Sequence, residues 1–274
     1  LQKAKTQPVA IIDRTIDKDI PVSSVNSSNT FAFIIGNENY QNVASVPFAA
    51  NDAKIFSEYC HKTLGLPKEN IKVYIDATYG KILGALSTLK QISQAYKGDI
   101  NVIFYYAGHG VPNEKNNEAY LLPADATPSM LEACLPLSSL YSSIGSIDAK
   151  QVIVFMDACF SGSRRENGMI VSARGVAIKP KKDMVTGNVV VFSAADGSET
   201  AYPYKEKGHG LFTYFLLKKL KESRGNVTLG DLADYIKTNV SQKSIVVNNK
   251  SQTPTISSSA QMQDVWRTMK LFRK

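Results

Sequence analysis

Residues 100–110 read INVIFYYAGHG, and residues 152–159 read VIVFMDAC. Each stretch begins with a short run of mostly apolar residues and ends in small or polar ones. Such a run is typical of a strand that is buried on both faces of a parallel sheet. One predicted strand is followed by His109 and the other by Cys159, so two reactive side chains each follow a strand.

Strands and helices alternate on both sides of these two strands. Apolar runs predict further strands at 31–36, 71–75 and 189–192. Apolar residues at helical spacing predict a helix capped by Asn51 and reaching Leu64, and helices over 82–96, over 211–221 and over 229–240 with Thr228 as cap. The alternation indicates one α/β domain with a largely parallel sheet and helices on both faces.

Two segments do not fit this alternation. Residues 1–29 are polar, and their end is rich in Ser and Asn, which predicts an N-terminal extension or linker, with a short edge strand at 9–12 as one alternative. The folded domain is then expected to span residues 30–274. Residues 161–187 are too long and too basic for an ordinary connection, which indicates a functional or mobile segment.

The composition is that of a folded chain, because 43% of the 274 residues are hydrophobic and 20% are charged. No apolar run approaches the roughly 20 residues that a membrane-spanning helix needs. The formal net charge is +8, but much of the excess lies between Arg164 and Lys182. No nucleic-acid-binding pattern accompanies it, so a solvated basic surface is expected and no nucleic-acid partner. The chain begins at Leu1 rather than Met, which is compatible with removal of a secretory signal.

The chemistry is expected beyond the carboxyl ends of the strands, because functional groups gather there in an open α/β sheet. That edge carries His109, Cys159 and several acids. A cysteine nucleophile needs a base within hydrogen-bond reach and donors for the developing oxyanion. His109 can serve as the base, and the backbone N–H groups of Gly110 and Cys159 can form the oxyanion hole.

The other histidines and cysteines have simpler interpretations. Cys60 lies on the apolar face of a predicted helix, and Cys134 lies in a loop without a recognisable pattern. His209 is also flanked by glycines, but it follows a polar stretch, so a role in a turn or helix start is expected. His61 neighbours Cys60 and points in another direction, so no role is expected for it. The sequence contains no serine-hydrolase elbow, phosphate-binding loop or zinc-protease helix motif.

Two motifs together resemble those of a known family. Residues 105–110 (YYAGHG) and 157–162 (DACFSG) are similar to the histidine and cysteine motifs of the caspase and metacaspase superfamily, and Cys159 follows His109 by 50 residues. The resemblance extends over about residues 30–220. It implies the caspase-haemoglobinase fold, an α/β fold with a mostly parallel six-stranded sheet between helices, and cysteine endopeptidase activity.

The resemblance also bears on the substrate. Animal caspases have Gln two residues before the nucleophile, where this chain has Asp157. Metacaspases and related bacterial peptidases use acids to bind the P1 residue, which precedes the scissile bond, and they cleave after Arg or Lys; Asp157 and Asp52 match those positions. Peptides and proteins with a basic P1 are therefore the expected partners, since two carboxylates attract a cation. Asp196 or Glu199 could add a third acid. The simpler alternatives are a helix cap for Asp157 and a favourable first-turn acid for Asp52.

The expected mechanism is attack by Cys159 with His109 as base. A corollary is self-cleavage within 161–187. The candidate cleavage sites are Arg164, Arg165, Arg174 and Lys182. The alternatives are a catalytically silent caspase-like scaffold that binds peptides or partners, and a peptidase with another P1 preference. No cofactor or resident metal is expected, and calcium activation, seen in some metacaspases, has no assignable ligand set here.

Overall fold

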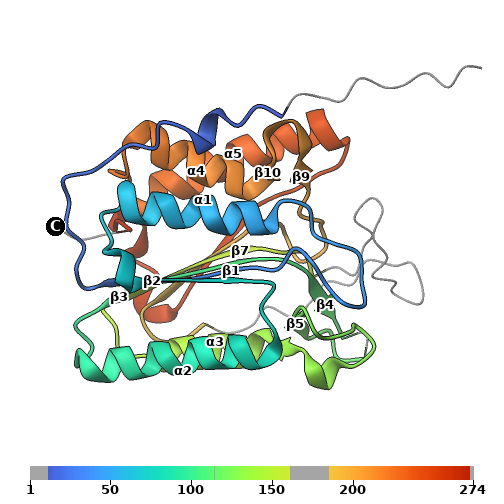
Figure 1. The fold of residues 1–274 in the computed structure, drawn as a ribbon, viewed down its shortest axis with the longest axis horizontal. Coiled ribbons are helices and arrows are strands. Elements are labelled where there is room, and N and C mark those ends of the chain that lie inside the picture. The colour runs from blue at the N-terminus through green and yellow to red at the C-terminus, as the bar shows by residue number, and fades with distance from the viewer. Residues whose placement is uncertain (1–11, 114, 161–184, 272–274) are drawn as a thin grey trace, which may run out of the picture.

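A computed structural model describes residues 12–113, 115–160 and 185–271. Its centre is a six-stranded sheet with the strand order β11-β8-β7-β3-β1-β2. Five of these strands run parallel, and β11 pairs antiparallel with β8 at one edge (Figure 1). The strands are β1 Thr30–Gly36, β2 Ile71–Ile75, β3 Asn101–Ala107, β7 Gln151–Asp157, β8 Val189–Ser193 and β11 Thr255–Ser258. The sheet confirms the predicted α/β fold class.

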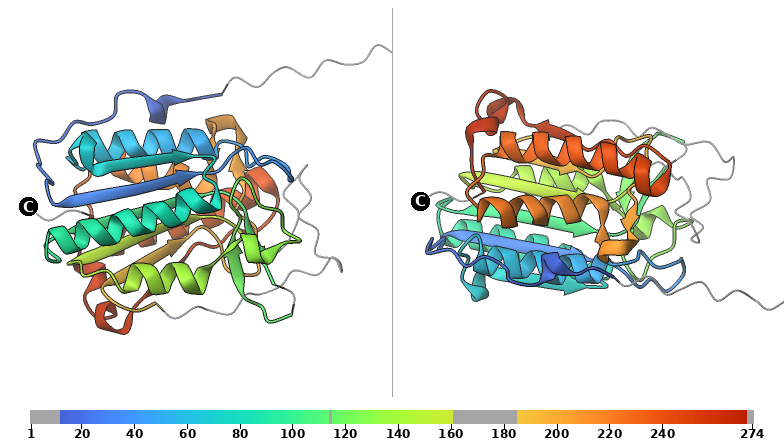
Figure 2. Two further views of the ribbon diagram at one scale, coloured as in Figure 1. Left: turned by 60° about the horizontal axis from the view of Figure 1, so that its bottom comes forward. Right: turned by 90° about the horizontal axis from the view of Figure 1, so that it is seen from above.

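The helices form one layer on each face of the sheet, as two views of the ribbon show (Figures 1 and 2). One layer contains α1 (Ala49–Lys62), α4 (Leu211–Ser223) and α5 (Leu229–Asn248). The other layer contains α2 (Tyr79–Ala95) and α3 (Leu137–Gly145). Within the described residues, none of the helices has the length and apolar character needed to cross a bilayer.

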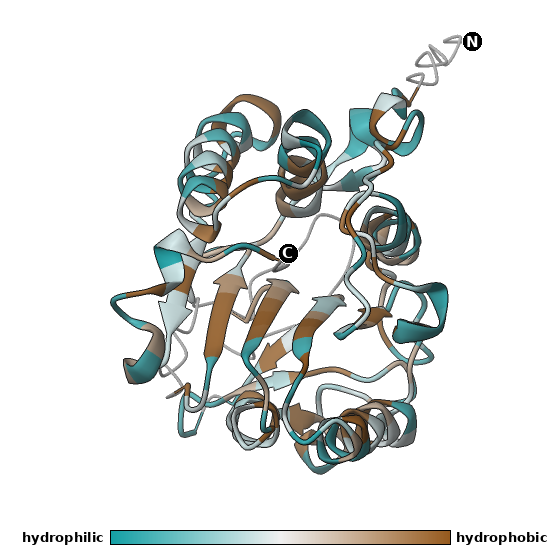
Figure 3. Cartoon of the chain, turned by 90° about the vertical axis from the view of Figure 1, so that its left-hand side faces the viewer, coloured by the Kyte–Doolittle hydropathy of each residue, from teal (hydrophilic) through white to brown (hydrophobic). Residues whose placement is uncertain are grey.

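The core lies between the sheet and both helix layers. Successive side chains of a strand point to opposite faces, so a strand covered on both faces must be apolar at nearly every position. In β3, for example, Ile103 and Tyr105 pack into the core under α1 and α4, whereas Val102 and Phe104 pack toward α2 and α3. Figure 3 shows these mainly hydrophobic strands between the helices. This double burial explains the unbroken apolar runs in the sequence.

Two small sheets lie at the end of the molecule toward which the parallel strands point (Figure 1). The first contains β4 (Gly110–Pro112), β5 (Ala119–Leu121) and β6 (Leu135–Pro136), and the second pairs β9 (Pro203–Tyr204) with β10 (His209–Gly210). Short 3-10 helices occur at Thr15–Asp17, Lys68–Asn70, Leu131–Ala133, Lys205–Lys207, Ala260–Met262 and Trp266–Thr268. His209 belongs to β10 in the second small sheet, and His109 directly precedes β4 in the first. The two histidines therefore lie at the same end of the molecule.

The first predicted helix start is wrong. α1 begins at Ala49, with Phe48 as N-cap, so Asn51 lies inside the helix and does not cap it. Instead, the Asn51 side chain donates a hydrogen bond to the carbonyl of Gly208, 3.1 Å away. By contrast, the predicted cap of α5 is confirmed, since the Thr228 hydroxyl accepts from a backbone N–H in the first turn. The sequence preference for Asn at helix caps thus selected a residue whose side chain makes a tertiary hydrogen bond instead.

The stretch preceding β1 is attached to the domain rather than extended away from it. The side chain of Ile16 is buried, and its carbonyl accepts a hydrogen bond from Tyr59 Oη in α1 at 2.9 Å. Further along, Thr63 Oγ1 donates to the carbonyl of Pro21 at 2.8 Å. The top view of Figure 2 shows this stretch, in dark blue, running beside α1 and α4.

Candidate active site

His109 and Cys159 lie at equivalent positions just beyond the ends of two neighbouring strands, β3 and β7. β3 pairs in parallel with β7, and the register places Ala107 opposite Asp157. Each reactive residue therefore follows a paired strand end by two positions. The two strand ends are also linked, because the N–H of Gly108 donates to the carbonyl of Asp157 at 3.3 Å. Since neighbouring strands are only about 4.8 Å apart, the fold brings the two residues to the same edge of the sheet.

Backbone and tyrosine contacts hold the ring of His109. Its Nε2 lies 2.8 Å from the carbonyl oxygen of Ala44. A carbonyl can only accept, so Nε2 carries a proton and Nδ1 is the proton acceptor of the neutral ring. The backbone N–H of His109 donates to Tyr40 Oη at 2.8 Å, and the Tyr40 ring packs 4.8 Å from the imidazole between ring centres. Tyr106 Oη donates to the His109 carbonyl at 2.8 Å.

Gly110 lies directly against the cysteine segment. A Cβ atom at this position would stand 2.6 Å from the carbonyl oxygen of Cys159 and 2.3 Å from the ring of Phe160. Both distances are well below a van der Waals contact, so only glycine fits here without a shift. Cys159 itself is 6% exposed. The chain after His109 thus passes directly beside the backbone of Cys159 and the ring of Phe160.

Asp52 and Asp157 meet in one small cavity at this end of the sheet. Asp52 comes from the first turn of α1, and Asp157 is the last residue of β7. The cavity has a volume of about 10 Å³, which is room for about one water molecule. Its other lining residues are Val46, Pro47, Ala49, Ala107, Tyr202, Pro203 and Gly210. Thr213, in the first turn of α4, donates to Asp157 Oδ2 from its hydroxyl at 2.7 Å.

Asp52 is hydrogen-bonded to a second histidine, which the sequence did not mark as part of the site. His209 Nδ1 lies 2.6 Å from Asp52 Oδ1, and the N–H of Gly210 donates to Asp52 Oδ2 at 2.8 Å. Burial raises the pKa of Asp52 to about 6, although the hydrogen bond to His209 opposes this shift and the nearby carboxylate of Asp157 adds to it. The sequence predicted a role for His209 in a turn or at the start of a helix. β10 does precede α4, but the histidine is fully buried and engaged in an ion pair.

A larger cavity of about 600 Å³ borders His109. It is lined on one side by residues that precede α1 and on the other by β9 and the end of α5. The lining residues are Ala44, Ser45, Pro47, His109, Tyr202, Pro203, Tyr204, Lys205, Glu206, Val247, Asn248, Asn249 and Lys250. Pro47, Tyr202 and Pro203 line both this cavity and the small cavity with the two acids. A groove beside the histidine therefore adjoins the acidic pocket.

Comparison with known proteins shows the family of the chain. A family model described as the caspase domain matches residues 29–265. The chain belongs to the caspase-domain family. It is also similar to a paracaspase from Dictyostelium discoideum, with 29% identity over 203 residues, which is 73% of this chain and 46% of that protein. The chain thus spans about half the length of this curated relative.

Solved structures show the same fold. Caspase-1 from Spodoptera frugiperda superposes with a TM-score of 0.63 at 15% identity, covering 96% of this chain and 98% of that one. A protein from Geobacter sulfurreducens gives a TM-score of 0.64 at 16% identity, covering 88% and 97%. At these identities the similarity shows the caspase fold alone.

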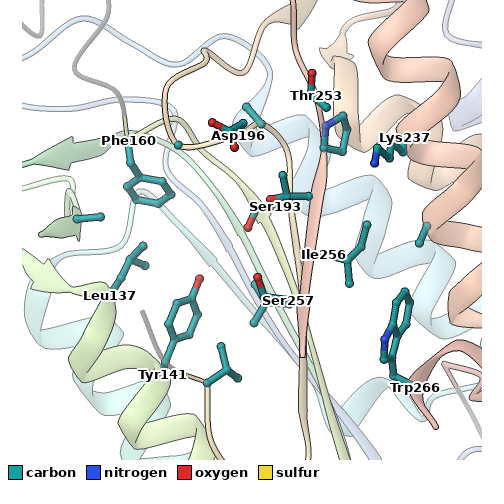
Figure 4. A pocket seen from close by; sticks show the side chains of 18 of the residues that line it. Leu137, Tyr141, Phe160, Ser193, Asp196, Lys237, Thr253, Ile256, Ser257 and Trp266 are labelled. Atoms are coloured by element: carbon teal, nitrogen blue, oxygen red, sulfur yellow. The ribbon is translucent and has the colours of Figure 1, made fainter. Parts of the chain in front are cut away.

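The third acid that the sequence suggested lies elsewhere in the caspase domain. Asp196 lines a different cavity, of about 610 Å³, beside β11 (Figure 4). Its Oδ1 accepts from the backbone N–H and the hydroxyl of Ser198. Glu199 is likewise engaged, since it accepts from the N–H and hydroxyl of Thr253. Neither side chain lines the cavity of Asp52 and Asp157.

The remaining thiols of the caspase domain are structural. Cys60 is fully buried in the core, as its helical spacing predicted, and burial raises the pKa of its thiol. Cys134 is also buried, and burial raises its pKa to about 11. A buried thiol with a raised pKa forms little thiolate and is inert. His61 Nδ1 contacts the Leu66 carbonyl at 2.9 Å, near the end of α1.

Two predictions concern residues or ions that the structure does not describe. The candidate self-cleavage sites Arg164, Arg165, Arg174 and Lys182 lie outside the described residues. In the part of the chain that is described, there is no group of three or more His, Cys, Asp or Glu side chains suited to hold a metal ion. Calcium activation and self-cleavage both stay predictions.

Proposed function

We propose that this caspase-domain protein is a cysteine endopeptidase that cleaves after Arg or Lys. The register of β3 and β7 carries the proposal, because it places His109 and Cys159 each two residues beyond a directly paired strand end. The cavity shared by Asp52 and Asp157 supports a basic P1 residue, since two carboxylates favour a cation and repel an acidic side chain.

The proposed reaction is acyl transfer to the thiol. His109 Nδ1 accepts the thiol proton, and the Cys159 sulfur attacks the carbonyl carbon of the scissile bond. The backbone N–H groups of Gly110 and Cys159 bind the resulting oxyanion. His109 then returns the proton to the leaving amine, and water hydrolyses the acyl-enzyme.

The acidic pocket must widen for this reaction. Its volume of about 10 Å³ holds about one water molecule, whereas an Arg or Lys side chain is several times larger. Pro47, Tyr202 and Pro203 line both this pocket and the larger groove beside His109, and so form the wall between them. A substrate lying in the groove would displace this wall and place its P1 side chain against the two carboxylates.

Fluorogenic peptides that differ only at P1 test the proposal. The wild type is expected to cleave after Arg and Lys and not after Asn or Asp, and the Cys159→Ala variant is expected to cleave none of them. Assays with and without calcium check for activation by that ion. Asp157→Asn should lower kcat/KM for the basic peptides. Absence of turnover under all conditions would favour a silent scaffold instead.

A further inference from the structure

The N-terminal segment, here residues 12–25, docks beside the acidic pocket. Ile16 is inserted into the core between α1 and α4, and its carbonyl accepts from Tyr59 Oη. Lys221 in α4 donates to the carbonyl of Thr15 at 2.8 Å. The N–H of Ser23 donates to the Lys62 carbonyl at the end of α1 at 2.8 Å. The segment therefore lies on the domain through several specific contacts along its length.

This segment contributes a carboxylate to His209. Asp17 Oδ1 lies 2.7 Å from His209 Nε2, on the opposite side of the ring from Asp52 Oδ1 at 2.6 Å. Each ring nitrogen therefore faces a carboxylate oxygen, which can only accept. Both nitrogens donate only in the doubly protonated imidazolium. The geometry is that of a cation between two anions, with the histidine fully buried and Asp17 11% exposed.

The charge on His209 matters for Asp52. Burial lowers the pKa of His209, but the hydrogen bonds to Asp17 and Asp52 outweigh burial and raise the pKa to about 9. The ring is therefore charged at neutral pH. Because burial raises the pKa of Asp52, this carboxyl group depends on the imidazolium to stay ionised. If His209 loses its charge, Asp52 binds a proton more readily and attracts a cation less.

His209 and Gly210 also fix where the Asp52 carboxylate points. One of its oxygens is bound by the His209 ring and the other by the N–H of Gly210. Gly210 lies between the two acids, because a Cβ atom there would stand 2.4 Å from Asp157 Oδ2 and 3.1 Å from Asp52 Oδ2. The position of β10 thus sets the spacing of the two carboxylates in the pocket.

We infer that the N-terminal segment sets the affinity for a basic P1 residue through the chain Asp17–His209–Asp52, in which Asp17 and His209 are positioning residues. The inference rests on the proposed function, which assigns Asp52 to the P1 pocket. A purely structural contact would weaken cleavage of every substrate alike when removed. If the chain of charges acts on P1, its removal should weaken cleavage only of substrates with a cationic P1 residue.

Paired substrates and a matched variant test the inference in the intact protein. Peptides with Arg or citrulline at P1 have nearly the same shape and differ in charge. Asp17→Asn is expected to lower the ratio of kcat/KM for Arg to that for citrulline about tenfold, mainly through KM, which corresponds to a binding difference of about 1.4 kcal/mol. Asp13→Asn is the control. Asp13 lies in the same N-terminal segment as Asp17, but it pairs with Lys207 and not with His209.

Two further variants separate charge from folding. Asp17→Glu keeps the negative charge, so its ratio of kcat/KM for Arg to that for citrulline should stay close to the wild-type value. His209→Gln keeps one hydrogen-bond donor but loses the positive charge, so it should lower this ratio as Asp17→Asn does. Thermal melting checks that each variant is folded. An unchanged ratio in folded Asp17→Asn or His209→Gln overturns the inference.

Failure of the proposed function gives a different result. If the wild type does not distinguish Arg from citrulline, the acidic pocket does not bind P1, and both proposals fall. Alkylation of Cys159 by iodoacetamide, which is small and uncharged, reports on the thiol alone. Its rate should be the same in the wild type, Asp17→Asn and Asp13→Asn. A slower rate in Asp17→Asn alone would place the effect at the thiol and overturn the inference about P1.

Discussion

At the scale of single residues, the orientation of His109 decides its role as a base. The Ala44 carbonyl fixes the proton on Nε2, and Tyr40 and Tyr106 hold the backbone of the histidine from two sides. None of these contacts uses a charged partner. Together they fix the ring and the backbone of His109 just beyond the end of β3.

Removing the base should slow acylation strongly. A positioned general base contributes about 10²- to 10⁴-fold to a rate, so His109→Ala is expected to lower kcat/KM on the Arg peptide by that factor. Steady-state kinetics with the fluorogenic peptide measures the effect. A loss of less than tenfold in a folded variant would show that another group removes the thiol proton.

Gly110 gives a steric prediction. In Gly110→Ala the added methyl would collide with the Cys159 carbonyl and the Phe160 ring, so the cysteine segment must shift. We expect activity to fall at least about 100-fold, the cost of losing one oxyanion donor. Gly84→Ala is the matched control, since nothing lies within 4 Å of its Cβ position on α2, and it should leave activity unchanged. Equal activity in both variants would contradict the assigned position of Gly110.

At the scale of elements, the sequence predicted the long apolar strands and most of the helices to within a few residues, although α5 continues to Asn248, eight residues beyond its predicted end. β3 spans Asn101–Ala107, for example, where the apolar run predicted 100–106. Burial on both faces leaves a strong local pattern in such strands. The short strands β4 to β6 and β9 to β11 were missed, because two to four residues carry too little periodicity, and the nine-residue helix α3 was missed as well. These short elements nevertheless shape the site.

The residues of the candidate site also divide into those that the sequence predicted and those that it missed. His109 and Cys159 could be found from strand ends and motifs, and Asp52 and Asp157 from the resemblance. The role of His209 could not, because its partner Asp17 lies 192 residues away in sequence and in the segment read as a linker. Ion pairs between distant segments leave no spacing pattern in one sequence.

The buried ion pair of β10 predicts a dependence of stability on pH. The pKa of His209 rises from 6.5 to about 9 on folding, so the folded state holds this proton more tightly than the unfolded state. The stabilisation is complete below about pH 6.5 and is lost as the pH rises through about 9. At 1.36 kcal/mol per pKa unit, it amounts to about 3 kcal/mol.

Urea unfolding at several pH values measures this effect. The free energy of unfolding of the wild type should fall between pH 6.5 and 9 relative to that of His209→Gln, which lacks the titrating group. Parallel curves for the two proteins over this range would show that His209 does not carry the charge assigned to it.

At the scale of the whole molecule, the segment 161–187 joins two strands in the interior of the sheet. β7 and β8 pair directly with each other, and each has another neighbour, β3 and β11 respectively. A break between β7 and β8 would remove none of these pairings. The architecture can therefore tolerate cleavage in this basic segment without separating the two pieces.

Self-cleavage should accordingly give two fragments that stay together. Incubated wild-type protein is expected to show two bands on a denaturing gel and a single peak of unchanged size in gel filtration, while Cys159→Ala stays intact. Replacing Arg164, Arg165, Arg174 and Lys182 together by Gln should prevent the cut. The same fragments in the wild-type and Cys159→Ala samples would refute self-processing.

The central claim is that Cys159 attacks peptides whose P1 residue is basic. Intact-mass spectrometry after incubation with a peptidyl chloromethyl ketone tests it directly, since this reagent alkylates the nucleophile only after its P1 side chain is bound. With Arg at P1, we predict one adduct on Cys159 in the wild type and none in Cys159→Ala, and with Asp at P1 no adduct on the same time scale. An adduct on a different residue, or equal labelling by the Arg and Asp reagents, would contradict the account.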